Sequence, residues 1–211
     1  MKQPRDFRSV RPGDLTGPER YGLLTSLVVP RTIGWISTVS KAGTPNLAPY
    51  SFFAALSSNP MLVGASIGHR GGEPKDTLAN IRETGEFCVN VCSRDLLEAM
   101  NLTSKEVSAD VDEFSLASLT ARQAMDVTAP WIEEAPAAME CVLFKEVELG
   151  QAPNVFVIGQ VERIHVREDM KFLGEGWNVD PDSLKPVGRL GKDRYAMPGE
   201  ICVLPRPPRD P

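Results

Sequence analysis

Short runs of apolar and β-branched residues, separated by glycine- and proline-rich turns, make up most of this chain. Such runs predict six strands, at residues 33–40, 46–53, 61–67, 87–91, 138–149 and 155–166. The first two runs flank the turn 41–44, in which Gly43 can adopt a positive φ. The last two flank the turn 151–154 in the same way. Consecutive strands joined by short turns predict antiparallel pairing.

Helical patterns are fewer and shorter. Three segments predict helices, at residues 19–28, 76–84 and 95–100. Pro18 suits the first turn of the first helix, and Pro30 stops that helix. Either Asp76 or Thr77 caps the second helix, and Gly85 ends it. Residues 101–135 predict a mixture of short helices and loops.

Together, these elements predict a mainly β protein with α insertions, built as an antiparallel barrel. Pro45 and Pro49 place the second strand at an edge or a bulge, because proline cannot donate to a strand ladder. The chain has no β–α–β alternation and no G-x-G-x-x-G motif, which argues against a Rossmann domain. We expect a lead-in over residues 1–17, one domain over 18–203 and a proline-rich tail over 204–211.

Composition narrows the class of protein. Apolar residues make up 42% and charged residues 24% of the 211 residues, as in globular proteins, so disorder of the whole chain is excluded. The net charge of −5 argues against a nucleic-acid binder, which needs a basic face. No run approaches the roughly 20 apolar residues of a membrane span, and residues 1–5 lack the apolar core of a signal peptide. We therefore expect a cytoplasmic protein without a membrane or nucleic-acid partner.

Motifs of protein-based catalysis are missing from the sequence. It contains no G-x-S-x-G elbow, no P-loop lysine motif and no H-E-x-x-H, and no convincing pair of carboxylates. The cysteines form no C-x-x-C pair and only two histidines accompany them, so we expect buried free thiols and no metal site. The cysteines are Cys88, Cys92, Cys141 and Cys202. If the protein is an enzyme, a bound cofactor is expected to supply the difficult chemistry.

The first candidate site is the hairpin formed by the first two strands. Counting outward from its turn places Thr38 opposite about Leu47, and Trp35 opposite about Tyr50. Hydroxyl, amide and backbone groups on this ribbon suit a flat heterocycle that both donates and accepts hydrogen bonds. The alternative is an ordinary strand surface that faces solvent. The polar members of the ribbon are Ser37, Thr38, Asn46 and Ser51.

The second candidate site is the loop that leads into the second helix. Its cationic groups, a hydroxyl, glycine-freed backbone amides and the start of a helix are the ingredients of a phosphate site. The alternative is a plain surface loop in which Asp76 caps the helix and would repel a phosphate. The polar members of the loop are His69, Arg70, Lys75, Asp76 and Thr77.

Several segments of the sequence resemble the flavin reductase-like family. They are residues 30–38, 43–53, 75–81, 85–90, 158–161 and 186–191, within a resemblance that covers about residues 18–200. The resemblance implies an FMN-binding split β-barrel, related to flavoredoxin, that usually forms a homodimer.

The resemblance also implies which residues bind the cofactor. The family's positions that bind the isoalloxazine and ribityl groups correspond to Ser37, Thr38, Asn46, Ala48, Pro49, Tyr50 and Ser51. The family's phosphate-binding positions correspond to Lys75 and Thr77, in the segment that also carries His69, Arg70 and Asp76. Arg189 and Tyr195 correspond to a C-terminal segment near the flavin.

The function implied by the resemblance is an FMN-dependent oxidoreductase, an NAD(P)H:flavin reductase that passes hydride from NADH or NADPH to FMN. The expected partners are a second copy, a nicotinamide donor and an unknown electron acceptor or monooxygenase component. We expect no catalytic side chain, because hydride transfer to a flavin needs proximity and stacking rather than a strong acid or base. Two alternatives stay open. One is an FMN-binding electron carrier or flavin-holding protein of the same fold, and the other is an interaction dimer with a degenerate flavin site.

Overall fold

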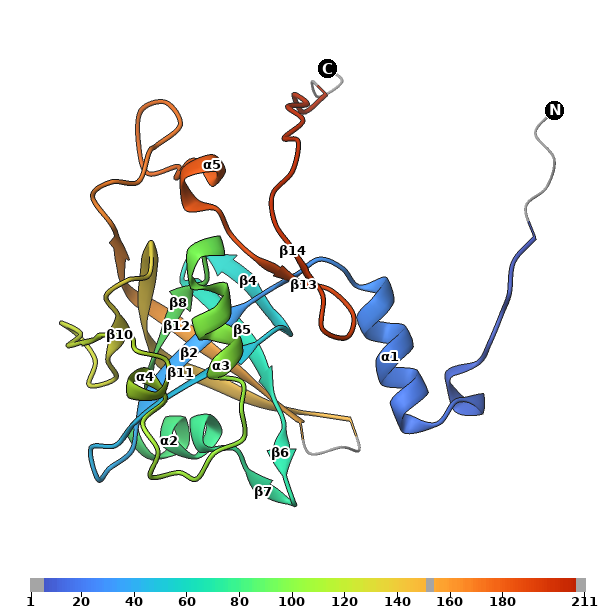
Figure 1. The fold of residues 1–211 in the computed structure, drawn as a ribbon, viewed down its shortest axis with the longest axis horizontal. Coiled ribbons are helices and arrows are strands. Elements are labelled where there is room, and N and C mark those ends of the chain that lie inside the picture. The colour runs from blue at the N-terminus through green and yellow to red at the C-terminus, as the bar shows by residue number, and fades with distance from the viewer. Residues whose placement is uncertain (1–5, 151–153, 208–211) are drawn as a thin grey trace.

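The body of the molecule is a seven-stranded antiparallel sheet (Figure 1). The computed structural model describes residues 6–150 and 154–207. From one edge to the other, the strands are β3 (Pro45–Tyr50), β2 (Gly34–Val39), β8 (Glu86–Val91), β11 (Ala137–Leu149), β12 (Asn154–Val166), β5 (Met61–Ile67) and β4 (Phe53–Ser58). The mainly β prediction is confirmed. In the described ranges no ladder joins β3 to β4, so hydrogen bonds do not close the sheet into a full barrel.

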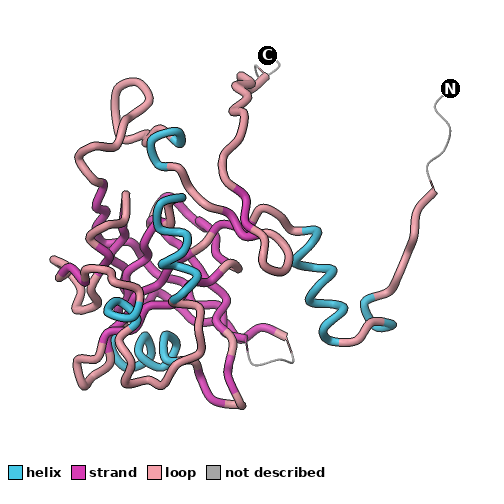
Figure 2. Tube along the Cα trace, in the orientation of Figure 1, coloured by secondary structure: helices cyan, strands magenta, loops and turns pink. Residues whose placement is uncertain are grey.

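The remaining elements are short and lie around this sheet (Figure 2). The helices are α1 (Gly17–Leu27), α2 (Asp76–Thr84), α3 (Leu97–Leu102), α4 (Glu113–Leu116) and α5 (Pro181–Leu184), with 3-10 turns at Pro12–Asp14 and Arg94–Leu96. The small strands are β1 (Arg31–Thr32), β6 (His69–Arg70), β7 (Glu73–Pro74), β9 (Ala121–Arg122), β10 (Trp131–Ile132), β13 (Gly188–Arg189) and β14 (Tyr195–Ala196). Figure 1 shows that α1 projects away from the sheet, whereas α2 packs under it.

Two hydrophobic clusters lie on the two faces of β2. Ile36 points into the first cluster, where Leu78 and Ile81 of α2 are completely buried. Trp35 points into the second cluster, which contains Phe114 of α4. Neighbouring residues of a strand face opposite sides, so the sequence Trp35-Ile36 supplies both clusters at once. The indole Nε1 of Trp35 donates to the Thr103 hydroxyl at 2.9 Å, which satisfies its polar atom.

The predicted strand 46–53 is two strands. β3 ends at Tyr50 and β4 begins at Phe53, so the chain passes from one edge of the sheet to the other within two residues. β4 pairs with β5 around the turn at Asn59-Pro60. The prediction of one continuous strand is wrong because the apolar run 50–56 hides the break at Ser51 and Phe52.

The predicted register of the β2–β3 hairpin is wrong by one residue. Thr38 lies opposite Asn46, and Trp35 lies opposite Pro49. The cause is a three-residue loop at 41–43, closed by a hydrogen bond from Ser40 N–H to the Thr44 carbonyl, where a two-residue turn was expected. Because side chains alternate along a strand, this shift reassigns which polar groups share a face.

The bounds of α2, Asp76–Thr84, match the prediction, but the predicted cap at its start does not. Gly85 ends the helix in the left-handed conformation, with a φ of 75°, as expected. The residue that precedes the helix is Lys75, and its side chain makes no capping hydrogen bond, so the prediction that Asp76 or Thr77 caps the helix is wrong. The first N–H groups of α2 are therefore free of a side-chain cap.

The proline-marked strand β3 is an edge strand, as predicted. All four cysteines are free, but only Cys88, Cys92 and Cys141 are buried, since Cys202 is exposed in the C-terminal segment. Within the part of the chain that the structure describes, no helix is long and apolar enough to cross a bilayer.

Candidate functional site

The two candidate sites lie side by side in one groove. Its volume is about 90 Å³, and it lies between β3, the start of α2 and the segment 103–106. Eight predicted residues line it: Asn46, Ala48, Pro49 and Tyr50 from the hairpin, and Arg70, Lys75, Asp76 and Thr77 from the loop and helix. The hairpin and the loop are thus brought together, although 20 residues or more separate them in sequence.

A buried polar network forms the floor of this groove. The Asn46 amide donates to the hydroxyls of Thr38 at 3.0 Å and Thr77 at 2.9 Å, and the Asn80 amide donates to Thr38 at 3.0 Å. All four side chains are buried. The alternative that these strand residues simply face solvent is therefore wrong. Because the Thr38 hydroxyl already accepts two hydrogen bonds, its main role is to join β2, β3 and α2 into one frame.

Tyr50 extends this network at the end of β3. Its phenol is buried, and burial raises its pKa to about 12, although a hydrogen bond with Thr77 opposes that rise. The phenol therefore stays protonated near neutral pH. It can donate or accept a hydrogen bond in the groove, but it does not supply a negative charge.

In the described part of the chain, three cations line the groove, together with the three carboxylates of Asp76, Glu106 and Glu113. The cations are Arg70, Lys75 and Lys105, and the uncapped N–H groups of α2 lie at the same place. The carboxylate of Glu106 partly neutralises Arg70, with 3.4 Å between the guanidinium nitrogen and the carboxylate oxygen. Several cations beside a helix N-terminus suit a phosphate group.

Glu113 is a lining residue that the sequence analysis missed. Its carboxylate lies in the groove and accepts the backbone N–H of Leu47 at 3.0 Å. Burial raises the pKa of Glu113, while the Leu47 N–H acts in the opposite direction. The sequence signal was Asp112, whose carboxylate caps α4 and thereby fixes the start of the helix that carries Glu113.

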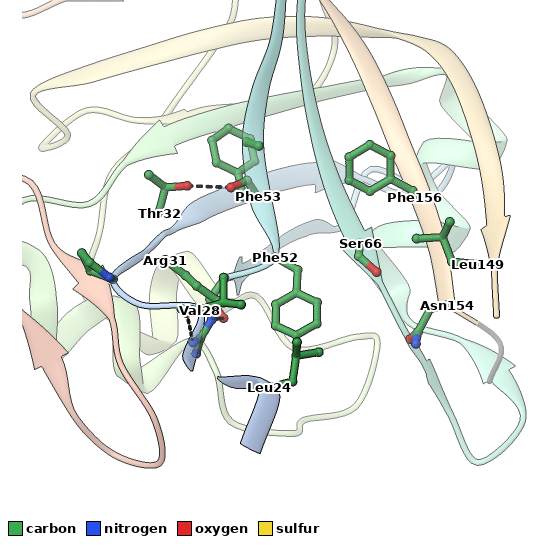
Figure 3. Close-up of a pocket in the computed structure, with 13 residues that line it drawn as sticks. Leu24, Val28, Arg31, Thr32, Phe52, Phe53, Ser66, Leu149, Asn154 and Phe156 are labelled. Atoms are coloured by element: carbon green, nitrogen blue, oxygen red, sulfur yellow. Dashed lines mark hydrogen bonds between the residues drawn. The ribbon is translucent and has the colours of Figure 1, made fainter. Parts of the chain in front are cut away.

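A larger, mainly apolar cavity is lined by residues of the corner between β3 and β4 (Figure 3). Tyr50 lines the groove, and the next residue, Ser51, lines this cavity of about 600 Å³. Figure 3 shows Leu24 of α1 beside the ring of Phe52, and Phe53 farther along the cavity near Thr32. The cavity falls within the roughly 300–1,000 Å³ of typical ligand pockets, whereas the groove has room only for a small group such as a phosphate.

Five predicted residues lie outside the lining of the groove and the cavity: Ser37, Thr38, His69, Arg189 and Tyr195. Thr38 belongs to the buried network described above. The Ser37 hydroxyl donates to the Pro130 carbonyl at 2.6 Å, on the face of β2 opposite the groove. Arg189 lies 4.5 Å from the ring centroid of Tyr195 and hydrogen-bonds its hydroxyl, which in turn donates to Asn101. His69 lies on β6, next to the lining residue Arg70. Their part in ligand binding stays a prediction.

Other lining residues had no signal in the sequence. Thr103, Ser104, Lys105 and Glu106 follow α3 in the region predicted only as a mixture of short helices and loops. Their distance from both the hairpin and the loop along the chain left nothing to connect them with the site. Packing of α3 against the second hydrophobic cluster brings this segment to the groove.

Comparison with known proteins places the chain in a family. The model of the flavin reductase like domain matches residues 26–174. An uncharacterized protein of Aquifex aeolicus is 38% identical over 189 residues, covering 89% of this chain and 94% of its own length. The uncharacterized protein YwrF of Bacillus subtilis is 34% identical over 197 residues, covering 92% of this chain and 96% of its own length.

Solved structures show the same relationship. Nitrilotriacetate monooxygenase component B from Bacillus cereus superposes with a TM-score of 0.91 at 34% identity, over 95% of this chain and 100% of that one. The 2-nitrobenzoate 2-nitroreductase of Pseudomonas fluorescens superposes with a TM-score of 0.86 at 28% identity, over 95% of this chain and 96% of that one. A Shewanella frigidimarina protein described with a split barrel domain superposes with a TM-score of 0.82 at 24% identity, over 96% of this chain and 100% of that one. At this identity the likeness shows the fold alone. The chain belongs to the flavin reductase-like family and has its split-barrel fold.

Proposed function

We propose that this protein is an FMN-dependent oxidoreductase that takes hydride from NADH or NADPH and passes the reducing equivalents to a second acceptor. Family membership supports a flavin-related oxidoreductase. Two similar structures belong to a monooxygenase component and a nitroreductase, which are both names of redox proteins. The nicotinamide donor and the direction of transfer are parts of the proposal.

The observation that carries the proposal is a pair of unlike spaces lined by consecutive residues of the chain, the first by Tyr50 and the second by Ser51. One is a small groove lined by charged and polar side chains, among them Arg70, Lys75 and Lys105, and the other is a large apolar cavity. FMN has the same division, with a phosphate at one end and a flat aromatic ring at the other. The residues present therefore fit this cofactor, with the phosphate in the groove and the ring toward the cavity.

Lys75 is the proposed centre of phosphate binding. It lines the groove directly before the uncapped first turn of α2, where backbone N–H groups add to its charge. Arg70 and Lys105 supply further positive charge in the same groove. Asp76 lines the groove too, and its carboxylate keeps the local charge from being wholly positive.

When bound, FMN would supply the hydride-accepting centre. The chain's own residues would then bind and orient it. The Thr38–Asn46–Thr77 network fixes β3 against α2. It thereby holds the hairpin residues and the phosphate-binding residues of the proposed site in fixed positions relative to each other. Tyr50 stays protonated near neutral pH because its pKa is about 12. No proton transfer by a side chain of the groove is needed in this scheme.

A second copy of the chain is the proposed cover of the cavity. α1 buries only Thr25, while Tyr21, Leu24 and Leu27 are exposed. An isolated helix of 11 residues is marginal in water, so α1 needs a packing surface that the rest of the described chain does not give it. A homodimer would bury this apolar face and enclose the cofactor. A monooxygenase component is the proposed acceptor of the reduced flavin, and the cytoplasm is the proposed compartment.

The test uses the purified full-length protein. We expect visible absorbance of bound flavin after addition of FMN and gel filtration, and oxidation of NADH or NADPH in air that depends on FMN. Flavin binding without oxidation of either nicotinamide would favour the electron-carrier alternative. Failure to bind any flavin would favour a degenerate site and would reject the proposal. Light scattering is expected to give twice the chain mass of 23.1 kDa, and a flavin-loaded monomer would reject the dimer.

A further inference from the structure

One charged side chain faces the apolar cavity. Among the described residues that line it, Arg31 is the only charged one. It lies on β1, directly after Pro30, and its side chain is buried between α1 and the corner that joins β3 to β4 (Figure 3). A guanidinium cannot lose its charge in a protein, so this corner carries a permanent positive charge.

Every described hydrogen bond of Arg31 goes to a neutral acceptor. Its Nη1 donates to the carbonyls of Thr25 at 2.7 Å and Val28 at 2.9 Å. Its Nη2 donates to the Leu190 carbonyl at 3.0 Å, and its Nε donates to the Ser51 hydroxyl at 3.3 Å. Among residues 6–150 and 154–207, no carboxylate lies within ion-pair distance of Arg31.

The described partners of Arg31 compensate its charge with partial charges alone, among them the carbonyls of Thr25 and Val28 at the C-terminal end of α1. A buried charge is costly unless an opposite charge compensates it. The ring of Phe52, whose centroid lies 5.8 Å from the guanidinium carbon, compensates only part of it. The five N–H groups of the side chain exceed the four described hydrogen bonds, so one donor on Nη2 has no described acceptor. The charge therefore remains available to a ligand.

The chemistry of the cavity indicates which ligand would use it. Aromatic and aliphatic side chains favour a flat ring, and one fixed cation favours negative charge on that ring. The flavin of the proposed function has this property in its reduced state, because uptake of two electrons and one proton leaves the ring with one net negative charge. Ser51, which Arg31 contacts, is among the residues expected to bind that ring.

We propose that Arg31 binds the reduced, anionic flavin ring more strongly than the oxidised, neutral ring and thereby raises the reduction potential of the bound cofactor. This inference rests on the proposed flavin binding. It adds a residue that sets how strongly the protein favours the reduced form. Arg31 also ties α1, Ser51 and the C-terminal segment together, so its charge is held in place by the fold.

The experiment compares the affinities of the protein for oxidised and reduced FMN. In the wild-type protein, we expect reduced FMN to bind more tightly than oxidised FMN. The reduction potential of bound FMN, measured by equilibration with a reference dye, should therefore lie above that of free FMN. Arg31→Gln is expected to weaken binding of reduced FMN about tenfold more than binding of oxidised FMN. That ratio corresponds to a fall of about 30 mV in the reduction potential of bound FMN, a two-electron couple. Arg31→Lys keeps the charge and is expected to retain most of the potential.

Arg122→Gln is the matched control, because it removes a positive charge from an exposed ion pair with Glu133 and is expected to leave the potential unchanged. An unchanged potential in flavin-loaded Arg31→Gln would overturn the proposal. The same holds if that variant loses its dimeric state at an unchanged potential, since a carboxylate of the second copy would then be the partner of Arg31. If Arg31→Gln fails to fold, the wild-type comparison decides, and tighter binding of oxidised FMN would contradict the proposal. Absence of any flavin binding by the wild-type protein would instead reject the proposed function itself.

Discussion

Two buried charges, Glu140 on β11 and Arg31 on β1, show two different uses of charge inside one fold. The Glu140 carboxylate on β11 accepts the N–H groups of Met125 at 2.9 Å and Asp126 at 2.6 Å, and lies 2.6 Å from Nε2 of His165. Arg31 has only neutral partners and borders a cavity. The first charge is satisfied by the chain itself and holds a loop to the sheet. The second is left open toward a ligand.

This difference separates structural from functional charges without any motif. Glu140 has no exposed surface, and its environment supplies donors that suit a carboxylate. His165 stacks on Trp131 with ring centroids 4.6 Å apart, which fixes the imidazole that contacts Glu140. Such a closed cluster should affect stability and leave binding unchanged. An open charge should do the reverse, and the following experiments test this division.

Removal of the closed charge should have the largest effect. We expect Glu140→Ala to lower the free energy of unfolding by about 3–5 kcal/mol, because buried donors lose their acceptor and His165 loses its partner. Urea denaturation measures this value. Glu148→Ala, on the exposed end of the same strand, is the control and should stay within about 0.5 kcal/mol. A loss below about 1 kcal/mol in Glu140→Ala would show that the cluster is not structural.

Removal of an open charge should affect ligand binding. We expect Lys75→Ala to weaken FMN by about ten- to a hundredfold and riboflavin far less, because only FMN carries the phosphate and a charge-assisted hydrogen bond contributes about 1.5–3 kcal/mol. Fluorescence titration with both ligands measures the ratio. Lys145→Ala on β11 is a control outside the groove lining. Equal weakening of the two ligands would place the phosphate elsewhere.

The closed charge should also make stability depend on pH. Burial acts to raise the pKa of Glu140, but the Met125 and Asp126 N–H groups and His165 outweigh it, so the pKa lies below the ordinary 4.5. A carboxyl with a lowered folded-state pKa stabilises the protein above its unfolded pKa, and this contribution is lost as pH falls through the folded value. We expect a smaller acid-induced loss of stability in Glu140→Gln, measured by urea denaturation between about pH 3 and pH 6. Parallel curves for the variant and the wild type would show that Glu140 does not titrate in this range.

Substitution of the two histidines, His69 and His165, is expected to have the smallest effect, which is measured on turnover. With saturating FMN, His69→Ala and His165→Ala should turn over NADH at nearly the wild-type rate, because the cofactor carries the reactive centre. Any loss of FMN affinity in His69→Ala should be rescued by added FMN. Turnover of the fully loaded proteins in stopped flow checks this. A drop of about 10²-fold would reveal a general acid or base and contradict a cofactor-only mechanism.

Local patterns predicted the elements of the fold well, but not the way they are brought together. The left-handed Gly85 and the edge position of β3 follow from single residues, glycine and proline, whose backbone limits are intrinsic. The hairpin register did not follow, because two- and three-residue turns differ by one residue that the sequence Lys41-Ala42-Gly43 does not settle. The break at Ser51 was hidden in an apolar run.

The site was predictable where its residues are neighbours in sequence. The hairpin and the loop before α2 each carry a visible cluster of polar groups, and the structure places both in one groove. Glu113 and Arg31 were missed because burial of a charge depends on tertiary packing. Lys105 is exposed and was missed because it lies far along the chain from both the hairpin and the loop. Arg31 in particular reads as an ordinary charged residue beside Pro30 until its partners at Thr25 and Leu190 are known.

The edge strand that carries the site has a consequence for self-association. Backbone N–H groups that point away from β2 would belong to residues 45, 47 and 49, since the Leu47 N–H points outward to Glu113. Pro45 and Pro49 have no N–H, and Glu113 occupies the third, so this edge offers an incoming strand no free donor over these positions. An open edge of a sheet is normally a template for aggregation. Here the molecule can leave β3 uncovered for a ligand and still resist growth into a continuous intermolecular sheet.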